Sequence, residues 1–204
     1  MSETAPDLVI GVDFDNTLIS YDAILHQLAL EAGLIGADTP AVKKAIRDAV
    51  RRSAFGERAW QALQGQAYGP RIDEAEPAPG AEAFIARCRQ EGVPVTVVSH
   101  KTAYARIDPT RTPMRLAAMG WLEARGFMPL EVRFGATRAE KLRHIRAGGF
   151  SHFIDDLEET FREPDFPAEV QGILYAPGDG AAPDLPGIPV ARSWAAISER
   201  IFGV

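Results

Sequence analysis

The sequence predicts an α/β fold: a mostly parallel sheet with helices on both faces, plus a small helical domain inserted after the first strand. Short apolar runs alternate with helical patterns along most of the 204 residues, and one stretch near the N-terminus contains helical patterns only. In addition, several apolar runs end on acidic or hydroxyl side chains, as strands do at the ligand-binding edge of an open α/β sheet.

Five apolar runs predict the strands. Residues 8–13 form a nearly continuous apolar run that ends at Asp13, as expected for a strand covered on both faces. The other four runs lie at residues 93–99, 131–134, 153–154 and 172–176, and the run at 131–134 has the weakest pattern. Runs this short, separated by helical patterns, are typical of the strands of a parallel sheet.

A helical pattern at residues 80–90 places Phe84, Ile85 and Cys88 on one face before Gly92 ends it. Cys88 is the only cysteine, so the chain cannot form an intramolecular disulfide or a cysteine zinc cluster. We therefore expect Cys88 to lie in the core.

Two later helices are marked by residues that favour helix starts. Thr112 and Pro113 predict the N-cap and the first helical position of a helix that runs to about residue 125. A capping-box pattern beginning at Thr137 opens a helix over residues 138–147. Both helices alternate with predicted strands, as the α/β class requires.

The stretch from residue 21 to residue 75 interrupts the alternation. Up to about residue 72 it contains only helical patterns, at residues 21–34, 41–55 and 57–68. An acidic, proline-containing connector follows at residues 73–79. We therefore predict two domains: an α/β core of residues 1–20 and 76–204, and a helical cap domain of residues 21–75. An insertion directly after the first strand lies at the carboxyl edge of the sheet, where open α/β sheets bind ligands.

Composition narrows the classes of function. The content of 25% charged and 46% hydrophobic residues is ordinary for a globular protein. The net charge of −6 argues against nucleic-acid binding through general basicity. The sequence shows no secretory signal at its start and no apolar run long enough to cross a membrane. We therefore predict a cytoplasmic protein with neither a membrane nor a nucleic-acid partner.

Two carboxylates follow the first predicted strand. Asp13 and Asp15 lie two residues apart, so in an extended chain both point to the same side. Two like charges at one place require a cation or a shared proton. The pair therefore predicts a metal ion, acid–base chemistry, or both.

Further polar residues follow the later strands. Ser99, Lys141 and the pair Asp155-Asp156 lie at strand ends or at the start of the next helix. Parallel topology gathers such positions at one edge of the sheet, even when they are far apart in sequence. Together with the first pair they suit phosphoryl transfer, which needs a nucleophile, an acid–base group, hydrogen-bond donors and positive charge.

Each of these residues also has a purely structural explanation. Aspartates favour turns, caps and helix starts, Ser99 suits a strand end, and Lys141 suits a solvated helix face. Their occurrence together is better explained by a site, because all of those independent explanations would otherwise have to hold at once. His100, directly after Ser99, is a further candidate for substrate contact, although the polarity of surface loops explains it equally well.

The order of these motifs resembles that of the haloacid dehalogenase (HAD) superfamily of aspartate-nucleophile phosphotransferases. The motifs are Asp-Phe-Asp-Asn-Thr at 13–17, Ser99, Lys141, and Ile-Asp-Asp at 154–156. The resemblance extends from about residue 8 to residue 159 and includes a helical insertion like the first-type (C1) cap. It implies a Rossmann-like core, and a hydrolase that acts on a phosphoric monoester with Mg²⁺ as its cofactor.

The resemblance also implies a role for each matching residue. Asp13 is the implied nucleophile that forms an aspartyl-phosphate, and Asp15 is the implied general acid and base. Lys141 is implied to neutralise the nucleophile and the phosphate, and Thr17 to support Asp15 and its loop. The implied metal ligands are Asp13, Asp15 through its backbone carbonyl, Asp155 and Asp156, and the candidate phosphate or substrate contacts are Thr17, Ser99, His100 and Lys141.

The expected function is that of a magnesium-dependent phosphatase whose partner is a small phosphorylated metabolite. A phosphotransferase or phosphomutase would use the same aspartyl-phosphate, and a non-catalytic binding or regulatory module could retain the fold. Carbon–halogen hydrolysis is less favoured, because the dehalogenases of the superfamily generally lack the acid–base aspartate that Asp15 supplies. The sequence leaves open the substrate, whether a homo-oligomer forms, and the roles of residues 100–112 and 177–189.

Overall fold

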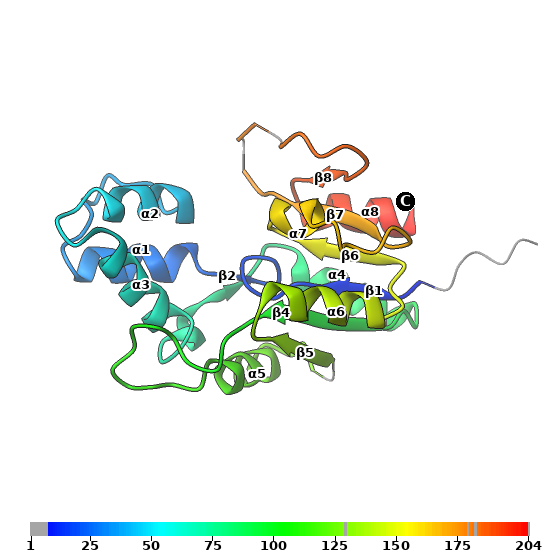
Figure 1. Ribbon diagram of the computed structural model, residues 1–204, viewed down its shortest axis with the longest axis horizontal. Helices are drawn as coiled ribbons and strands as arrows, with labels where there is room; N and C mark the ends of the chain where they lie inside the picture. Colours follow the sequence, from blue (N-terminus) through cyan, green and yellow to red (C-terminus); the bar gives the residue numbers. More distant parts are fainter. Residues whose placement is uncertain (1–7, 129, 179, 182, 204) are drawn as a thin grey trace, which may run out of the picture. The chain divides into compact units, whose positions relative to one another are not determined.

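The structure, a computed structural model, describes residues 8–128, 130–178, 180–181 and 183–203 (Figure 1). Its contacts divide the chain into two compact units. The core unit comprises the described residues within 8–18, 77–100 and 130–203, and the helical unit comprises Ile19–Glu76 and Lys101–Met128. No helix among the described residues is both long and apolar enough to cross a lipid bilayer.

The core unit is built on a six-stranded sheet in which every strand pair is parallel. In spatial order the strands are β5 (Glu131–Gly135), β4 (Val95–His100), β1 (Ile10–Val12), β6 (His152–Asp155), β7 (Gln171–Tyr175) and β8 (Val190–Ala191). The predicted α/β class with a mostly parallel sheet is therefore confirmed. Because all the strands are parallel, their carboxyl ends lie at one edge.

The register of β1 fixes which residues meet at that edge. Val12 lies beside Val97 on one side and Ile154 on the other. The next residue, Asp13, continues the ladder by donating its N–H to the Ile154 carbonyl at 2.8 Å. Consequently, β1 and β6 end in step, and Asp13 and Asp155 leave the sheet side by side.

Helices cover both faces of this sheet (Figure 1). They are α4 (Ala81–Gln90), α6 (Arg138–Ala147), α7 (Glu158–Arg162) and α8 (Trp194–Phe202). On one face α4 and α8 pack together through the rings of Phe84 and Trp194, whose centroids are 4.9 Å apart. On the other face α6 contributes Leu142 and Ile145 to an apolar cluster that includes Phe153 of β6. Burial of this apolar surface is the main source of stability for such a layered unit.

The predicted strands differ from the observed ones by at most two residues at each end. Two predictions agree fully with the structure: Cys88 is fully buried in α4, and α6 has the predicted bounds. In contrast, β8 and α8 were not predicted. Strand β8 has only two residues, and both elements follow a Gly/Pro-rich segment that has no hydrophobic periodicity.

The helical unit contains three helices from the predicted insertion and a fourth from later in the chain. They are α1 (Asp22–Glu31), α2 (Lys43–Arg51), α3 (Gly56–Ala67) and α5 (Met114–Ala124), with a 3₁₀ turn η1 (Ile72–Glu74) between α3 and α5. The helix predicted at residues 41–55 is shorter at both ends. Its start is set by the Asp22 carboxylate, which accepts the Lys43 N–H at 2.8 Å.

The predicted cap at Thr112 is wrong. Helix α5 begins at Met114, and its N-cap position is Pro113, which has no side chain that can cap. Thr112 is instead held in a turn, because its N–H donates to the Asp108 carboxylate at 2.8 Å and its hydroxyl contacts Thr110. The Asp108 turn therefore outcompetes the helix for Thr112.

The two compact units also differ from the predicted domain boundaries, since residues 101–128 group with the helical unit. Two contacts explain this grouping. The Trp121 indole N–H donates to the Ala75 carbonyl at 2.9 Å, and Gly65 of α3 leaves no room for a Cβ against the Ile107 carbonyl. A separate two-stranded sheet pairs β2 (Ile19–Ser20) with β3 (Glu76–Pro77), at two of the places where the chain passes between the units.

Candidate active site

A buried lysine joins two aspartates at the carboxyl edge of the core sheet. The Lys141 ammonium donates to Asp13 Oδ1 at 2.7 Å and to Asp155 Oδ2 at 2.6 Å. The three side chains come from α6, the end of β1 and the end of β6, and each is at most 5% exposed. Residues from three of the four predicted motifs are therefore in direct contact.

Burial dominates the electrostatics of this group. Desolvation raises the pKa of the Asp13 carboxyl to about 7, with the charges of Asp155 and Asp15 adding to the rise and Lys141 opposing it. Burial alone would lower the pKa of Lys141, but the two carboxylates outweigh it and hold that pKa above its usual range. Lys141 therefore remains an ammonium ion across the neutral pH range.

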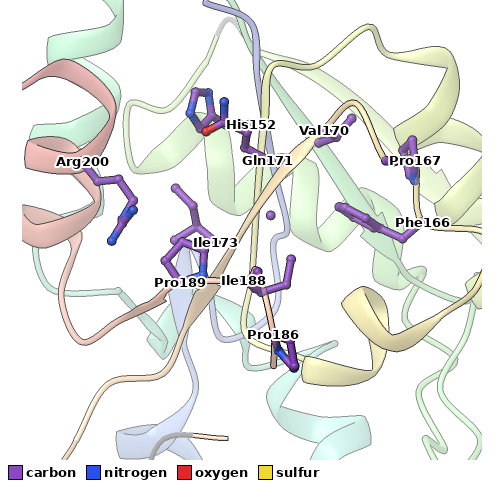
Figure 2. A pocket seen from close by; sticks show the side chains of 13 residues that line it. His152, Phe166, Pro167, Val170, Gln171, Ile173, Pro186, Ile188, Pro189 and Arg200 are labelled. Carbon is purple, nitrogen blue, oxygen red and sulfur yellow. The ribbon is translucent and has the colours of Figure 1, made fainter. Parts of the chain in front are cut away.

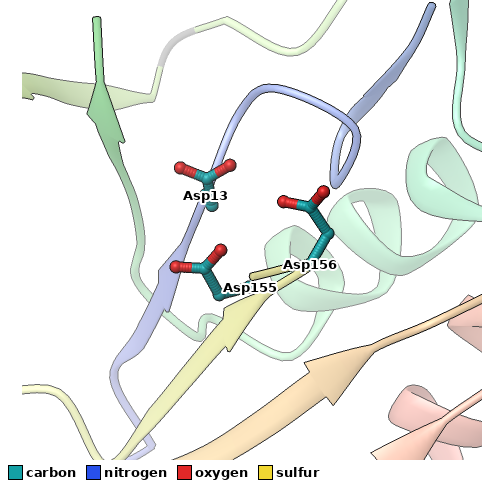
Figure 3. Close-up of side chains that lie close together, drawn as sticks. All are labelled: Asp13, Asp155 and Asp156. Atoms are coloured by element: carbon teal, nitrogen blue, oxygen red, sulfur yellow. The ribbon is translucent and has the colours of Figure 1, made fainter. Parts of the chain in front are cut away.

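Three carboxyl groups at this edge are close enough to share one ion. Oxygen atoms of Asp13, Asp155 and Asp156 all lie within 4.8 Å of one another (Figure 3). Asp155 is held in place by the Leu157 N–H, which donates to its Oδ1 at 3.0 Å. Mg²⁺ prefers oxygen ligands and binds through a few carboxylates while it keeps several waters, so this donor set fits the expected cofactor. The Asp15 side chain is not part of this cluster, and the ligand role of its backbone carbonyl stays a prediction.

Two hydroxyl groups near these residues lack hydrogen-bond partners. Thr17 Oγ1 and Ser99 Oγ are buried and make no hydrogen bond with any residue that the structure describes. Ser99 is the penultimate residue of β4, the neighbour of β1, so it lies at the same sheet edge as Asp13. A buried polar group without a partner costs about 1–3 kcal/mol, which a bound oxyanion that accepts from the hydroxyl would offset.

His100 differs from the other candidates. It is exposed, and its Nε2 lies 3.1 Å from the Ala136 carbonyl. This contact holds the ring against the loop before α6. A role for His100 in binding substrate stays a prediction.

Local interactions place Lys141 in the first turns of α6. Thr137 Oγ1 accepts the Glu140 N–H at 3.1 Å, as the capping-box pattern predicts. The Glu140 carboxylate accepts the Ala136 N–H at 2.6 Å, one residue earlier than in a reciprocal capping box. Both bonds fix the start of α6 and hence the position of Lys141.

Gly135 is a residue whose importance the sequence analysis missed. It ends β5 just before α6, and a Cβ built on it would lie only 2.7 Å from the Lys141 backbone nitrogen. Any side chain at this position would displace the turn of α6 that carries the lysine. A glycine shortly before a capping motif is the only signal in the sequence, and it does not reveal how closely the helix approaches.

Trp194 is the second missed residue, and it supports the loop after Asp13. Its indole N–H donates to the Thr17 carbonyl at 3.2 Å. The loop itself is a tight turn in which Asn16 has a φ of 62° and the Leu18 N–H donates to the Phe14 carbonyl at 3.1 Å. A contact across 177 residues leaves no local pattern in the sequence.

Comparisons with known proteins identify the fold. No family model and no curated protein matches the sequence. Solved structures do match. A protein provisionally assigned as a phosphoglycolate phosphatase, from Lactobacillus delbrueckii subsp. bulgaricus, is 16% identical with a TM-score of 0.60, covering 97% of this chain and 99% of its own.

Two further structures extend this result. A subfamily IA HAD-superfamily hydrolase from Geobacter sulfurreducens is 12% identical with a TM-score of 0.58, covering 98% of this chain and 100% of its own. A Bacillus subtilis protein provisionally assigned as a HAD-hydrolase, and bound to magnesium, is 13% identical with a TM-score of 0.56, covering 97% and 99%. The chain therefore has the HAD-like fold, as the order of its motifs indicates.

We predict that Gly135→Ala destabilises the protein by about 1–3 kcal/mol, because the new Cβ meets backbone atoms that cannot rotate away. Chemical denaturation measures this change. The matched control is Gly120→Ala, an exposed site in α5 with nothing near the new Cβ, which should be neutral or stabilising by up to about 1 kcal/mol. Equal stabilities for the two variants would contradict the proposed close approach.

We predict that Trp194→Phe loosens the loop after Asp13, because the buried Thr17 carbonyl loses its donor at a cost of about 1–3 kcal/mol. Hydrogen exchange at the Thr17 and Leu18 amides, both bonded to the Phe14 carbonyl, should become faster. Trp60→Phe, at another buried tryptophan, is the control and should leave these two amides unchanged. Unchanged exchange in Trp194→Phe would show that the indole bond does not hold the loop.

Proposed function

We propose that this protein is a magnesium-dependent phosphatase that hydrolyses a small phosphorylated metabolite through an aspartyl-phosphate on Asp13. The observation that carries the proposal is the buried bridge from Lys141 to Asp13 and Asp155, beside the unpartnered hydroxyls of Ser99 and Thr17. A nucleophilic carboxylate, a fixed positive charge and free donors are what phosphoryl transfer requires. Fold similarity to a provisionally assigned phosphatase and to a magnesium-bound protein supports the same function.

The proposed reaction has two steps. In the first, a carboxylate oxygen of Asp13 bonds to phosphorus, the bond from phosphorus to the leaving oxygen breaks, and Asp15 gives its proton to that oxygen. In the second, water bonds to phosphorus while Asp15 takes its proton, and the bond between phosphorus and Asp13 breaks. Inorganic phosphate leaves, and both aspartates return to their starting states.

The remaining residues balance charge during these steps. Lys141 stays protonated and keeps one Asp13 oxygen in position, while the Ser99 hydroxyl donates to a phosphate oxygen. The side chains of Asp13, Asp155 and Asp156, with the Asp15 carbonyl, are the groups that would hold Mg²⁺. When bound, the ion supplies positive charge to the phosphate oxygens and so reduces their repulsion from Asp13.

Carbon–halogen hydrolysis is the second candidate, because one of the similar structures is a dehalogenase with a TM-score of 0.60 and 12% identity over 98% of this chain and 99% of its own. Two features favour phosphate chemistry. Asp15 supplies an acid–base group that a halide leaving group does not need, and the three clustered carboxyl groups suit a divalent cation.

We expect the purified protein to hydrolyse 4-nitrophenyl phosphate or a member of a phosphorylated-metabolite panel with magnesium present. Asp13→Asn should lower kcat/KM by at least about 1000-fold, because an amide cannot act as the nucleophile. The matched control is Asp165→Asn, which makes the same change at an aspartate whose side chain is 79% exposed and which should keep wild-type activity.

Two results would contradict the proposal. One is undiminished hydrolysis by Asp13→Asn. The other is release of halide from 2-chloropropionate by a wild-type enzyme that hydrolyses no phosphate ester in the panel.

A separate prediction concerns metal binding and needs no substrate. Mg²⁺ at 100 times its dissociation constant should stabilise the folded protein by about 2.7 kcal/mol, through preferential binding to the native state. Asp156→Asn should reduce the thermal shift, whereas Asp165→Asn should not, because only Asp156 belongs to the acidic cluster. An equal shift in both variants would place the Mg²⁺ elsewhere.

A further inference from the structure

A cavity opens at the amino edge of the core sheet, away from the acidic cluster. Its volume is about 470 Å³, and it lies beside the first residues of β6 and β7. Figure 2 shows Arg200 of α8 on one side, Phe166 on the other, and Ile173 between them. Ligand cavities of globular proteins have volumes of about 300–1,000 Å³, so this one is large enough for a small organic molecule.

The cavity exists because the outer strand of the sheet is short. β8 pairs only with Leu174 and Tyr175, so the first three residues of β7 have no strand partner on that side among the described residues. The segment before β8 contains Pro186 and Pro189, which have no N–H group to donate to a ladder. Pro189 is joined to β7, since its carbonyl accepts the Leu174 N–H at 2.9 Å, but the Ile188 N–H donates to the Leu185 carbonyl in a turn instead. Among the described residues the pairing therefore stops at Pro189, and the space beside the first residues of β7 stays open.

The walls of the cavity are mostly apolar but include one positively charged side chain. Phe166, Ile173, Ile188 and two prolines supply apolar surface, while Arg200 supplies a positive charge. The Arg200 side chain makes no hydrogen bond or ion pair with any residue that the structure describes. Moreover, no aspartate or glutamate is among the described residues that line the cavity, although the chain as a whole has a net charge of −6.

Two further polar groups lie at the strand starts. His152 of β6 and Gln171 of β7 are register partners, and their side chains are hydrogen-bonded to each other. His152 Nδ1 lies 3.0 Å from Ser151 Oγ. Burial keeps the pKa of His152 below its usual value, and at neutral pH the ring is uncharged. Arg200 is therefore the cation that an incoming anion would meet.

We propose that this cavity binds a small carboxylate with an aromatic or branched apolar body. The carboxylate would pair with the Arg200 guanidinium, whose planar donors match its two oxygens. The apolar body would lie against Phe166, Ile173 and Ile188. This site is separate from the proposed phosphatase centre, since it lies at the amino end of β6 and Asp155 lies at the carboxyl end.

The test compares phenylacetate with phenylacetamide, which has the same size and shape but no charge. The probe is added to the full-length protein without substrate, and backbone amide shifts are followed by NMR. Phenylacetate should bind with a dissociation constant of about 1 mM, as expected for a ligand of this size. Its shifts should cover residues 166–173 and 186–189, and the amide should bind at least about tenfold more weakly.

Two variants test the role of charge. Arg200→Gln should weaken phenylacetate binding at least about tenfold, and Arg52→Gln, at an exposed arginine of the helical unit, should leave it unchanged. Gln171→Glu adds a negative charge to the exposed rim with almost no change in size and should also weaken binding. Its control is Gln90→Glu at the exposed end of α4.

Three results would overturn the proposal of a carboxylate site. The proposal is overturned by equal affinities for the acid and the amide, by shifts that fall outside the cavity, or by wild-type affinity in both Arg200→Gln and Gln171→Glu. If Arg200→Gln does not fold, Gln171→Glu decides alone. Because no step uses the acidic cluster, Asp13→Asn should bind phenylacetate like the wild type, so failure of the proposed phosphatase activity would leave this result intact.

Discussion

The buried contact of Lys141 with Asp13 and Asp155 is the constraint on which the rest of the core unit depends. Each of these ions loses its hydration on folding, at a cost of several kcal/mol, and only close pairing offsets that cost. Removing one partner would leave an uncompensated charge in the core. The sheet register and the start of α6 must therefore agree closely, because an error in either would separate the ions.

Three separate features produce that agreement. Parallel pairing ends β1 and β6 in step, so the two aspartates leave the sheet together. The hydroxyl of Thr137 fixes the start of α6, and Gly135 lets this helix approach the strand end closely enough for the lysine to reach both carboxylates. The cluster still contains more carboxylates than ammonium groups. This excess of negative charge favours a divalent cation at the same edge.

The sequence predicts the features that depend on interactions between residues a few positions apart, and it misses those that depend on residues far apart in the chain. The strands and the start of α6 were predictable because apolar runs and a capping hydroxyl act within a few residues. The bond from Trp194 to Thr17 was not, because its partners are 177 positions apart. The same limit explains why residues 101–128 were assigned to the core, since the bond from Trp121 to Ala75 that ties them to the helical unit has no local signature.

The two edges of the sheet differ for a physical reason. At the carboxyl edge, each strand is followed by a loop or helix start, and backbone donors and charged side chains converge there. The amino edge is normally closed by the segments that enter the strands. Here the segment entering β8 bonds to β7 at Pro189, but before that residue it turns back on itself through the bond from Ile188 to Leu185, so the closure fails at one place. Strand β6 therefore connects a polar, charged site at Asp155 with an apolar cavity at His152. An apolar body gains from leaving water for the walls of this cavity, and inorganic phosphate has no such part, so the two ends suit different ligands.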